Sequence, residues 1–193
     1  MYIWESIQGL ESRSYTCGYC GNALASEKGW VARLSRQGPF GAFIYVCHQC
    51  WQPTFFDHTQ RQTPGVVFGG PVTDIPEKMV EQLYEEARKT TGAGAYTAAV
   101  LCCRKLLMHI AVFKGATPGD TFINYVQFLA DKNFIPPDAK DWVDHIRKKG
   151  NEANHEIAIM TKGDAEELLS FCEMLLKVIF EFPATIKRKI GKP

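Results

Sequence analysis

The sequence predicts a mainly α-helical protein in which a small β unit precedes a set of packed helices. Two observations lead to this prediction. The first 70 residues hold 12 of the 23 aromatic residues of the chain, but only five basic and four acidic residues. The rest of the chain carries 17 charges of each sign and nearly all of the apolar spacing typical of helices. We therefore expect a β unit at residues 1–62, a Gly/Pro-rich linker at 63–74 and a helical unit at 75–193.

The strongest chemical signal in the β unit is a set of four cysteines. Cys17 and Cys20 form one C-x-x-C pair, and Cys47 and Cys50 form a second pair. Two residues between thiolates let one tight turn present both sulfurs to a single metal ion, and two such turns complete a tetrahedral site. We expect a structural zinc ion here, because four thiolates leave no coordination position open for water. A redox dithiol is the alternative, but two pairs arranged around a β hairpin fit a metal site better.

The residues between the two cysteine pairs predict that hairpin. Segments 30–34 and 42–46 have the composition of strands, and 37–39 is a turn, so the whole predicts a zinc ribbon. Arg33 and Arg36, with nearby aromatic residues, can meet phosphates and stack on bases. Alternatively the aromatic residues cover the ribbon, and the near-neutral charge of the unit favours this interpretation. These aromatic residues are Trp30, Tyr45, Trp51, Phe55 and Phe56.

The composition of the whole chain limits its partners. The formal net charge is +1, so any contact with nucleic acid or anionic lipid must be local. The N-terminus lacks the pattern of a secretory signal, and no run of about 18 apolar residues is seen, so we expect a cytoplasmic protein without membrane attachment. The other cysteines, Cys102, Cys103 and Cys172, are expected to be small buried apolar residues.

Helical spacing and capping residues place the helices in the second part. Asp74 with Glu77 is expected to begin the first helix, and Thr161 with Asp164 forms a capping box for the last. Pro183 is expected to end that last helix. The expected helices lie at about 74–89, 95–113, 120–129, 136–149 and 161–182.

The C-terminal part suggests two kinds of contact. The apolar face of the helix at 161–182 is wide enough for a central or interfacial helix, which indicates a partner. Residues 184–193 contain four basic residues and no acidic one. We expect a solvated, partly disordered end, with a nonspecific arm for RNA or DNA as the alternative.

A polar segment, residues 146–155, follows the fourth predicted helix. Lys148 and Lys149 lie where cations favour a helix C-terminus. Gly150 and Asn151 are the residue types most tolerant of the left-handed conformation that ends a helix. The helix is therefore expected to end here.

The side chains beyond this helix end have two interpretations. Asn151, Asn154 and His155 gather amide and imidazole groups within a few residues. In one interpretation they satisfy free carbonyls and fasten the next helix. In the other they form a polar site in which His155 exchanges a proton and Arg147 stabilises an anion, a pairing suited to phosphodiester chemistry.

Two motifs resemble a known family. The pattern R-x-x-G-N-x-A-x-H at 147–155, with the helix A-A-V-L-C-C-R-K-L-L at 98–107, resembles an uncharacterised bacterial domain family of the HEPN superfamily. The resemblance covers about residues 75–180. It implies a helical bundle that is often dimeric and is frequently attached to restriction, phage-defence and toxin–antitoxin systems.

The resemblance also bears on catalysis. HEPN ribonucleases work without a metal and carry the pattern Arg-polar-x-x-x-His. Asn151 and His155 match its last two positions, whereas Gly150 occupies the arginine position. The nearest arginine, Arg147, lies three residues earlier.

The residues predict a zinc ribbon followed by a helical bundle with a polar turn. The resemblance implies that the bundle is HEPN-like and that the chain acts as a binding or regulatory module in nucleic-acid-directed defence or its regulation. One alternative is a metal-independent endoribonuclease, and another is a protein-interaction adaptor for a larger defence effector. The expected partners are a second copy of the chain, RNA or DNA, and such an effector. In the ribonuclease alternative the catalytic residues are His155, Asn151 and Arg147, and the substrate-binding residues are Arg104, Lys148, Lys149 and Asn154.

Overall fold

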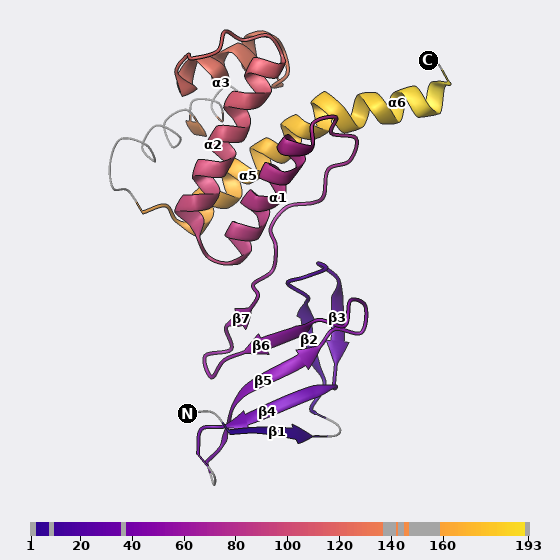
Figure 1. The fold of residues 1–193 in the computed structure, drawn as a ribbon, viewed down its shortest axis with the longest axis vertical. Helices are drawn as coiled ribbons and strands as arrows, with labels where there is room; N and C mark the ends of the chain where they lie inside the picture. Colours follow the sequence, from indigo (N-terminus) through magenta and orange to yellow (C-terminus); the bar gives the residue numbers. More distant parts are fainter. Residues whose placement is uncertain are drawn as a thin grey trace. The chain divides into compact units, whose positions relative to one another are not determined.

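The chain divides into two compact units, Met1–Val67 and Phe68–Pro193 (Figure 1). The computed structural model describes residues 3–7, 10–35, 38–136, 142, 145–146 and 159–191. The division between the units lies inside the segment 63–74 that the sequence assigns to a linker.

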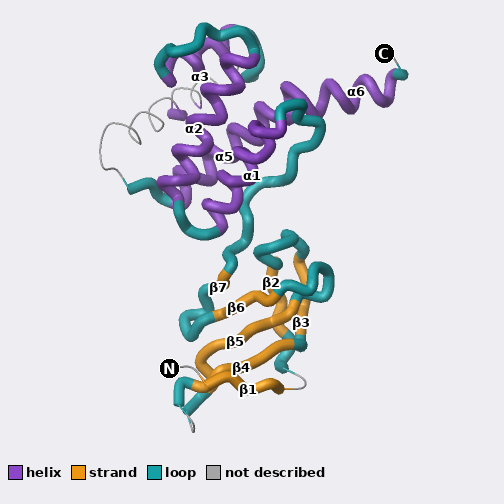
Figure 2. The backbone as a smooth tube through the Cα atoms, in the orientation of Figure 1, coloured by secondary structure: helices purple, strands orange, loops and turns teal. Residues whose placement is uncertain are grey.

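The first unit consists of two antiparallel sheets (Figure 2). A five-stranded sheet has the order β1-β4-β5-β6-β7, and β2 pairs with β3 in a separate hairpin. The strands are β1 Ile3–Ile7, β2 Arg13–Thr16, β3 Ala23–Ser26, β4 Gly29–Arg33, β5 Phe40–Val46, β6 Pro53–Phe56 and β7 Gln62–Thr63. The predicted pairing of the segments around 30–34 and 42–46 is confirmed as β4 with β5, whereas the β2–β3 hairpin was not predicted.

One face of the larger sheet forms the core of this unit. Val31 pairs with Phe43, and Phe43 pairs with Phe56, so these three side chains point to the same side. The residues that alternate with them along the strands point to the other side. Trp30 is one of these, and it is 41% exposed. The core residues are Leu10, Tyr15, Cys17, Val31, Tyr45, Cys47 and Phe56. Two of the four predicted ligands are therefore core residues.

The second unit is helical. Its elements are α1 Lys78–Gly92, α2 Tyr96–Phe113, α3 Phe122–Asp131, α5 Lys162–Leu176, the π-helical segment η2 Lys177–Glu181 and α6 Phe182–Ile190. Helix α2 packs against α1, α3 and α5 (Figure 1). Its buried face consists of Ala99, Val100, Cys103, Leu106, Leu107, Ile110 and Ala111. Among the described helices, α2 is the one long and apolar enough to cross a membrane, but this buried face is that of a core helix.

The start of α1 differs from the sequence prediction. The helix begins at Lys78, and Asp74 lies before it with φ 62°. The carboxylate of Asp74 instead accepts two hydrogen bonds from the guanidinium of Arg188, at 2.7 and 3.0 Å. A charged partner distant in sequence has replaced the local cap, so the prediction for Asp74 is wrong. The capping box of Thr161 and Asp164 is confirmed at the start of α5.

The prediction that Pro183 ends the last helix is also wrong. After α5 the chain passes through η2 into α6, which reaches Ile190 and ends at Gly191 with φ 64°. Proline lacks an N–H group and is tolerated where a new helical turn begins, and Pro183 occupies such a position in α6. The wider turn of η2 separates the two hydrogen-bond ladders. Residues 184–190 are therefore helical, and they project beyond the other helices of the unit (Figure 1).

The segment before α1 is fixed to the helices by hydrogen bonds. The N–H of Gly70 donates to Glu173 at 2.9 Å, and the hydroxyl of Tyr84 donates to the carbonyl of Gly70 at 2.8 Å. Arg88 donates to the carbonyls of Phe68 and Gly69 at 3.3 and 2.8 Å. This part of the predicted linker therefore belongs to the structure of the helical unit.

Candidate metal centre

Two hairpin turns bring the four cysteines together. Cys17 and Cys20 lie in the connection between β2 and β3, and Cys47 and Cys50 lie in the connection between β5 and β6. The Sγ atoms of Cys17 and Cys50 are 3.6 Å apart, and those of Cys20 and Cys47 are 3.8 Å apart. All four sulfur atoms lie within 4.8 Å of one another. The four cysteines can hold a metal ion between them.

The two turns have the same backbone geometry, and we call them knuckle 1 (residues 17–22) and knuckle 2 (residues 47–52). In knuckle 1 the N–H of Cys17 donates to the carbonyl of Asn22 at 2.9 Å, and the N–H of Gly21 donates to that of Cys17 at 2.9 Å. Knuckle 2 repeats both bonds. There Cys47 donates to Gln52 at 3.0 Å and Trp51 donates to Cys47 at 2.8 Å. The repeat places the cysteines of each knuckle alike around one point.

Hydrogen-bond donors surround the sulfur atoms. The N–H of Tyr19 donates to Cys17 Sγ at 3.4 Å, and the side-chain amide of Asn22 donates to Cys20 Sγ at 3.4 Å. The backbone N–H and the amide of Asn22 lower the pKa of Cys20 to about 7. At Cys50 the N–H of Gln52 lowers the pKa, but burial and the three neighbouring thiols raise it to about 12. A cation bound between the four sulfur atoms would favour the ionised form of the thiols and so lower the pKa of Cys50.

The burial of the cysteines differs within each pair. Cys17 and Cys47 are fully buried, whereas Cys20 is exposed and Cys50 is partly exposed. Knuckle 1 is also covered by the chain after β7, because a Cβ atom on Gly18 would lie 2.3 Å from the carbonyl oxygen of Pro64. The candidate metal centre therefore lies at the edge of the core, with two of the cysteines buried and two near the surface.

The aromatic residues predicted around the centre divide into two groups. Tyr45 and Phe56 are core residues, 3% and 2% exposed, as the packing interpretation expects. Trp51 in knuckle 2 is 66% exposed, and Tyr19 in knuckle 1, a ring that the sequence analysis did not name, is 54% exposed. The sequence could not separate these groups, because the tertiary packing of strands and turns decides which rings are buried.

Two basic side chains of the β unit, Arg33 and Lys28, each lie against an aromatic ring. The guanidinium of Arg33 lies 4.2 Å from the ring centroid of Phe40, and its Nη1 atom donates to the carbonyl of Gly38 at 3.1 Å. The ammonium of Lys28 lies 5.0 Å from the ring centroid of Trp51. Arg36 lies outside the described residues. Of these cations, Lys28 is therefore the one placed beside a knuckle, and the sequence analysis did not identify it.

The second predicted site falls almost wholly outside the described residues. This applies to every side chain proposed for it from 147 to 155: Arg147, Lys148, Lys149, Asn151, Asn154 and His155. Ile146, which precedes them, is 1% exposed and belongs to the helical core. Arg104 lies on α2, partly buried, with its guanidinium 4.4 Å from the ring centroid of Phe122. Burial lowers the pKa of Arg104.

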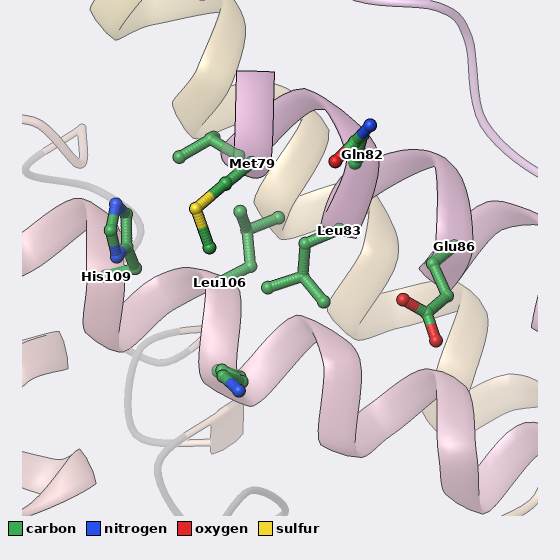
Figure 3. Close-up of a pocket in the computed structure, with 8 residues that line it drawn as sticks. Met79, Gln82, Leu83, Glu86, Leu106 and His109 are labelled. Carbon is green, nitrogen blue, oxygen red and sulfur yellow. The ribbon is translucent and has the colours of Figure 1, made fainter. Parts of the chain in front are cut away.

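A cavity that the sequence analysis missed lies between α1 and α2 (Figure 3). Its volume is about 240 Å³, and Leu83 and Leu106 contribute to its apolar lining. In Figure 3, His109 lies at one end of this lining and Glu86 at the other. His109 Nε2 is 2.6 Å from a carboxylate oxygen of Glu77. Only the pairing of the two helices brings these residues together, so no local pattern could have identified the cavity.

Comparisons with known proteins place the helical unit in a family. A family described as domain of unknown function (DUF4145) matches residues 85–190. A Rab3 GTPase-activating protein catalytic subunit from Danio rerio is 24% identical over 153 residues, which is 76% of this chain and 15% of that protein. The chain thus spans a small part of that relative. No solved structure matches the chain.

Proposed function

We propose, from the premise that this chain belongs to the DUF4145 family, that it is a cytoplasmic zinc-stabilised module with a HEPN-like helical bundle. Its role is to bind nucleic acid in phage defence or in the regulation of defence. The four-cysteine centre is the observation that carries the proposal, because it builds a rigid binding unit beside exposed aromatic rings.

The spacing of the sulfur atoms supports zinc as the metal. Zinc–sulfur bonds of about 2.3 Å in a regular tetrahedron place neighbouring sulfurs about 3.8 Å apart. Two of the separations between sulfur atoms, Cys17 to Cys50 and Cys20 to Cys47, are 3.6 and 3.8 Å. A site with four thiolates has no open position for water or substrate, so its role is structural. In so small a unit the bound ion contributes much of the folding free energy.

The arrangement of the helices supports a HEPN-like bundle. The motif at residues 98–107 lies on α2, the helix that packs against α1, α3 and α5. The family match at 85–190 includes this motif and the polar motif at 147–155. Both motifs of the resemblance therefore fall within one family domain.

Binding of nucleic acid is supported by the surface of the zinc unit. Trp51 and Tyr19 present rings to solvent, and Lys28 lies beside one of them. Bases stack on exposed aromatic rings, and cations meet the phosphates. Fluorescence anisotropy with labelled RNA, single-stranded DNA and duplex DNA at several salt concentrations tests this function. We expect affinity that falls as salt rises. A protein with full zinc content that binds none of the three at low salt would contradict it.

The ribonuclease alternative rests on His155 and Asn151, which match two positions of the HEPN catalytic pattern. In that case His155 moves the proton and Arg147 stabilises the charged transition state. Chelator-treated protein and its His155→Ala variant, incubated with mixed RNA, decide between the two functions. Cleavage by the wild type alone would establish the enzyme. Equal RNA loss with both proteins would reject it.

A homodimer is part of the proposal, and α6 supports it. Phe182, Ile186 and Ile190 recur every four residues along this helix, and they are 50%, 54% and 62% exposed. Such a stripe is typical of a helix that packs against a partner. Light scattering after size exclusion measures the mass of the assembly. Co-purification of a larger protein, without affinity for nucleic acid, would instead favour the adaptor role.

A further inference from the structure

Knuckle 2 contains a residue that its backbone does not favour. Gly21 and Trp51 occupy equivalent positions in the two knuckles and make equivalent backbone hydrogen bonds. Both are left-handed, with φ 73° at Gly21 and 59° at Trp51. Glycine adopts this conformation freely, whereas a side chain with a Cβ atom is strained there. Knuckle 1 shows that glycine serves the turn, so the turn itself does not explain a tryptophan in knuckle 2.

Packing within the unit does not explain Trp51 either. Its side chain is 66% exposed, and Trp51 does not belong to the core cluster of this unit. A large apolar side chain held in a strained and exposed position gains little from folding. Residues of this kind are typical of binding sites, where the strain is offset by the ligand.

The positively charged side chain of Lys28 lies beside the exposed ring of Trp51. Its ammonium lies 5.0 Å from the ring centroid of Trp51, within cation–π distance. Two hydrogen bonds hold the backbone of Lys28 in place. Its N–H donates to Ser26 Oγ at 3.3 Å, and its carbonyl accepts from the N–H of Val46 at 2.9 Å. Lys28 therefore places a positive charge at a fixed point beside an exposed aromatic ring.

We propose that Trp51 and Lys28 form a binding site for one unpaired nucleotide of a single strand. The base stacks on the face of the Trp51 ring that Lys28 does not cover, and the ammonium of Lys28 contacts the adjoining phosphate. This inference deepens the proposed function and rests on it. An unpaired nucleotide fits because it combines a planar group with a negative charge. A base within a duplex cannot offer its face to the ring, so the site discriminates against duplexes.

The test compares three variants of the full chain loaded with zinc. The probes are fluorescein-labelled oligo(U) RNA and oligo(dT) DNA, with a duplex of mixed sequence for comparison. We expect Trp51→Gly to weaken binding of the single strands by about 5-fold to 100-fold. Its zinc content should be unchanged and its unfolding temperature equal or higher, because glycine relieves the strained backbone. Lys28→Gln should weaken binding and reduce the salt dependence by about one phosphate contact. Trp30→Ala removes another exposed tryptophan, on β4, and should change neither the affinity for single strands nor its salt dependence.

The outcomes separate this inference from the proposed function. Equal binding of single strands by wild type and Trp51→Gly would overturn the nucleotide site and leave nucleic-acid binding intact. Absence of binding by the zinc-loaded wild type would overturn both. A protein that co-purifies with wild type but not with Trp51→Gly, without binding of either oligonucleotide, would assign Trp51 to a protein interface and reject the inference.

Discussion

Replacing Gly18 with alanine tests how knuckle 1 is held in place. The added Cβ atom would lie 2.3 Å from the carbonyl oxygen of Pro64 and 2.6 Å from that of Gly65. Both are backbone atoms, so no flexible side chain can move aside. His48 occupies the equivalent position in knuckle 2 and is exposed. A glycine is therefore required by the close approach of residues 64–65, and not by the turn.

The size of the effect follows from this geometry. Ordinary contacts of a Cβ atom begin at 3.4 Å, so the two segments must separate by about 1 Å. Forcing extra atoms into a packed site costs about 1–3 kcal/mol. For a unit of this size, each kcal/mol lowers the unfolding temperature by about 4–8 °C. We expect the transition of the β unit to fall by at least about 4 °C in Gly18→Ala.

Calorimetry of the zinc-loaded chain, followed in parallel by near-ultraviolet circular dichroism, measures this transition. His48→Ala is the matched control, because it changes the equivalent position where the side chain is exposed, and its effect should stay within about 0.5 kcal/mol. Zinc content is measured for each protein. If Gly18→Ala unfolds at the temperature of the wild type, residues 64–65 do not press on the knuckle and the reasoning is refuted.

Three further predictions concern the metal, the pH dependence and the helical core. Cys20→Ser should lower zinc affinity and destabilise the β unit while the helical transition stays unchanged, and equal zinc retention in competition with a chelator would contradict this. Burial raises the pKa of Glu173, but Lys177 and the N–H of Gly70 lower it more, so it lies below its ordinary value. Its contribution to stability is therefore present at neutral pH and is lost as pH falls through the carboxylate range. Glu173→Gln should be less stable than wild type at pH 7 and equal to it in acid, and a difference independent of pH would reject that role. Leu106→Ala, at a fully buried site in α2, should cost about 2–5 kcal/mol in denaturant unfolding, and a cost below about 1 kcal/mol would place it outside the core.

Local patterns in the sequence predicted much of the fold. The C-x-x-C spacing identified the four cysteines that lie together, because a tight turn is a local structure. The helical period located α2 and α5, and the capping box at Thr161 fixed where α5 begins. Each of these features depends on residues within a few positions of one another.

The predictions that failed depend on contacts between distant residues. Asp74 has the side chain of a helix cap, but Arg188 binds its carboxylate. Pro183 would end a helix in isolation, but here it lies in the first turn of α6, which begins directly after η2. The exposure of Trp51 and the close approach at Gly18 are likewise set by tertiary structure. The polar segment with His155 lies outside the described residues, so its role stays a prediction.

X-ray absorption at the zinc edge, with the metal content of the same sample, determines whether the four cysteines bind zinc. We expect one zinc ion per chain with four sulfur neighbours at about 2.3 Å, supplied by Cys17, Cys20, Cys47 and Cys50. A first shell that includes nitrogen or oxygen, or protein that stays folded and metal-free in the presence of zinc, would contradict it.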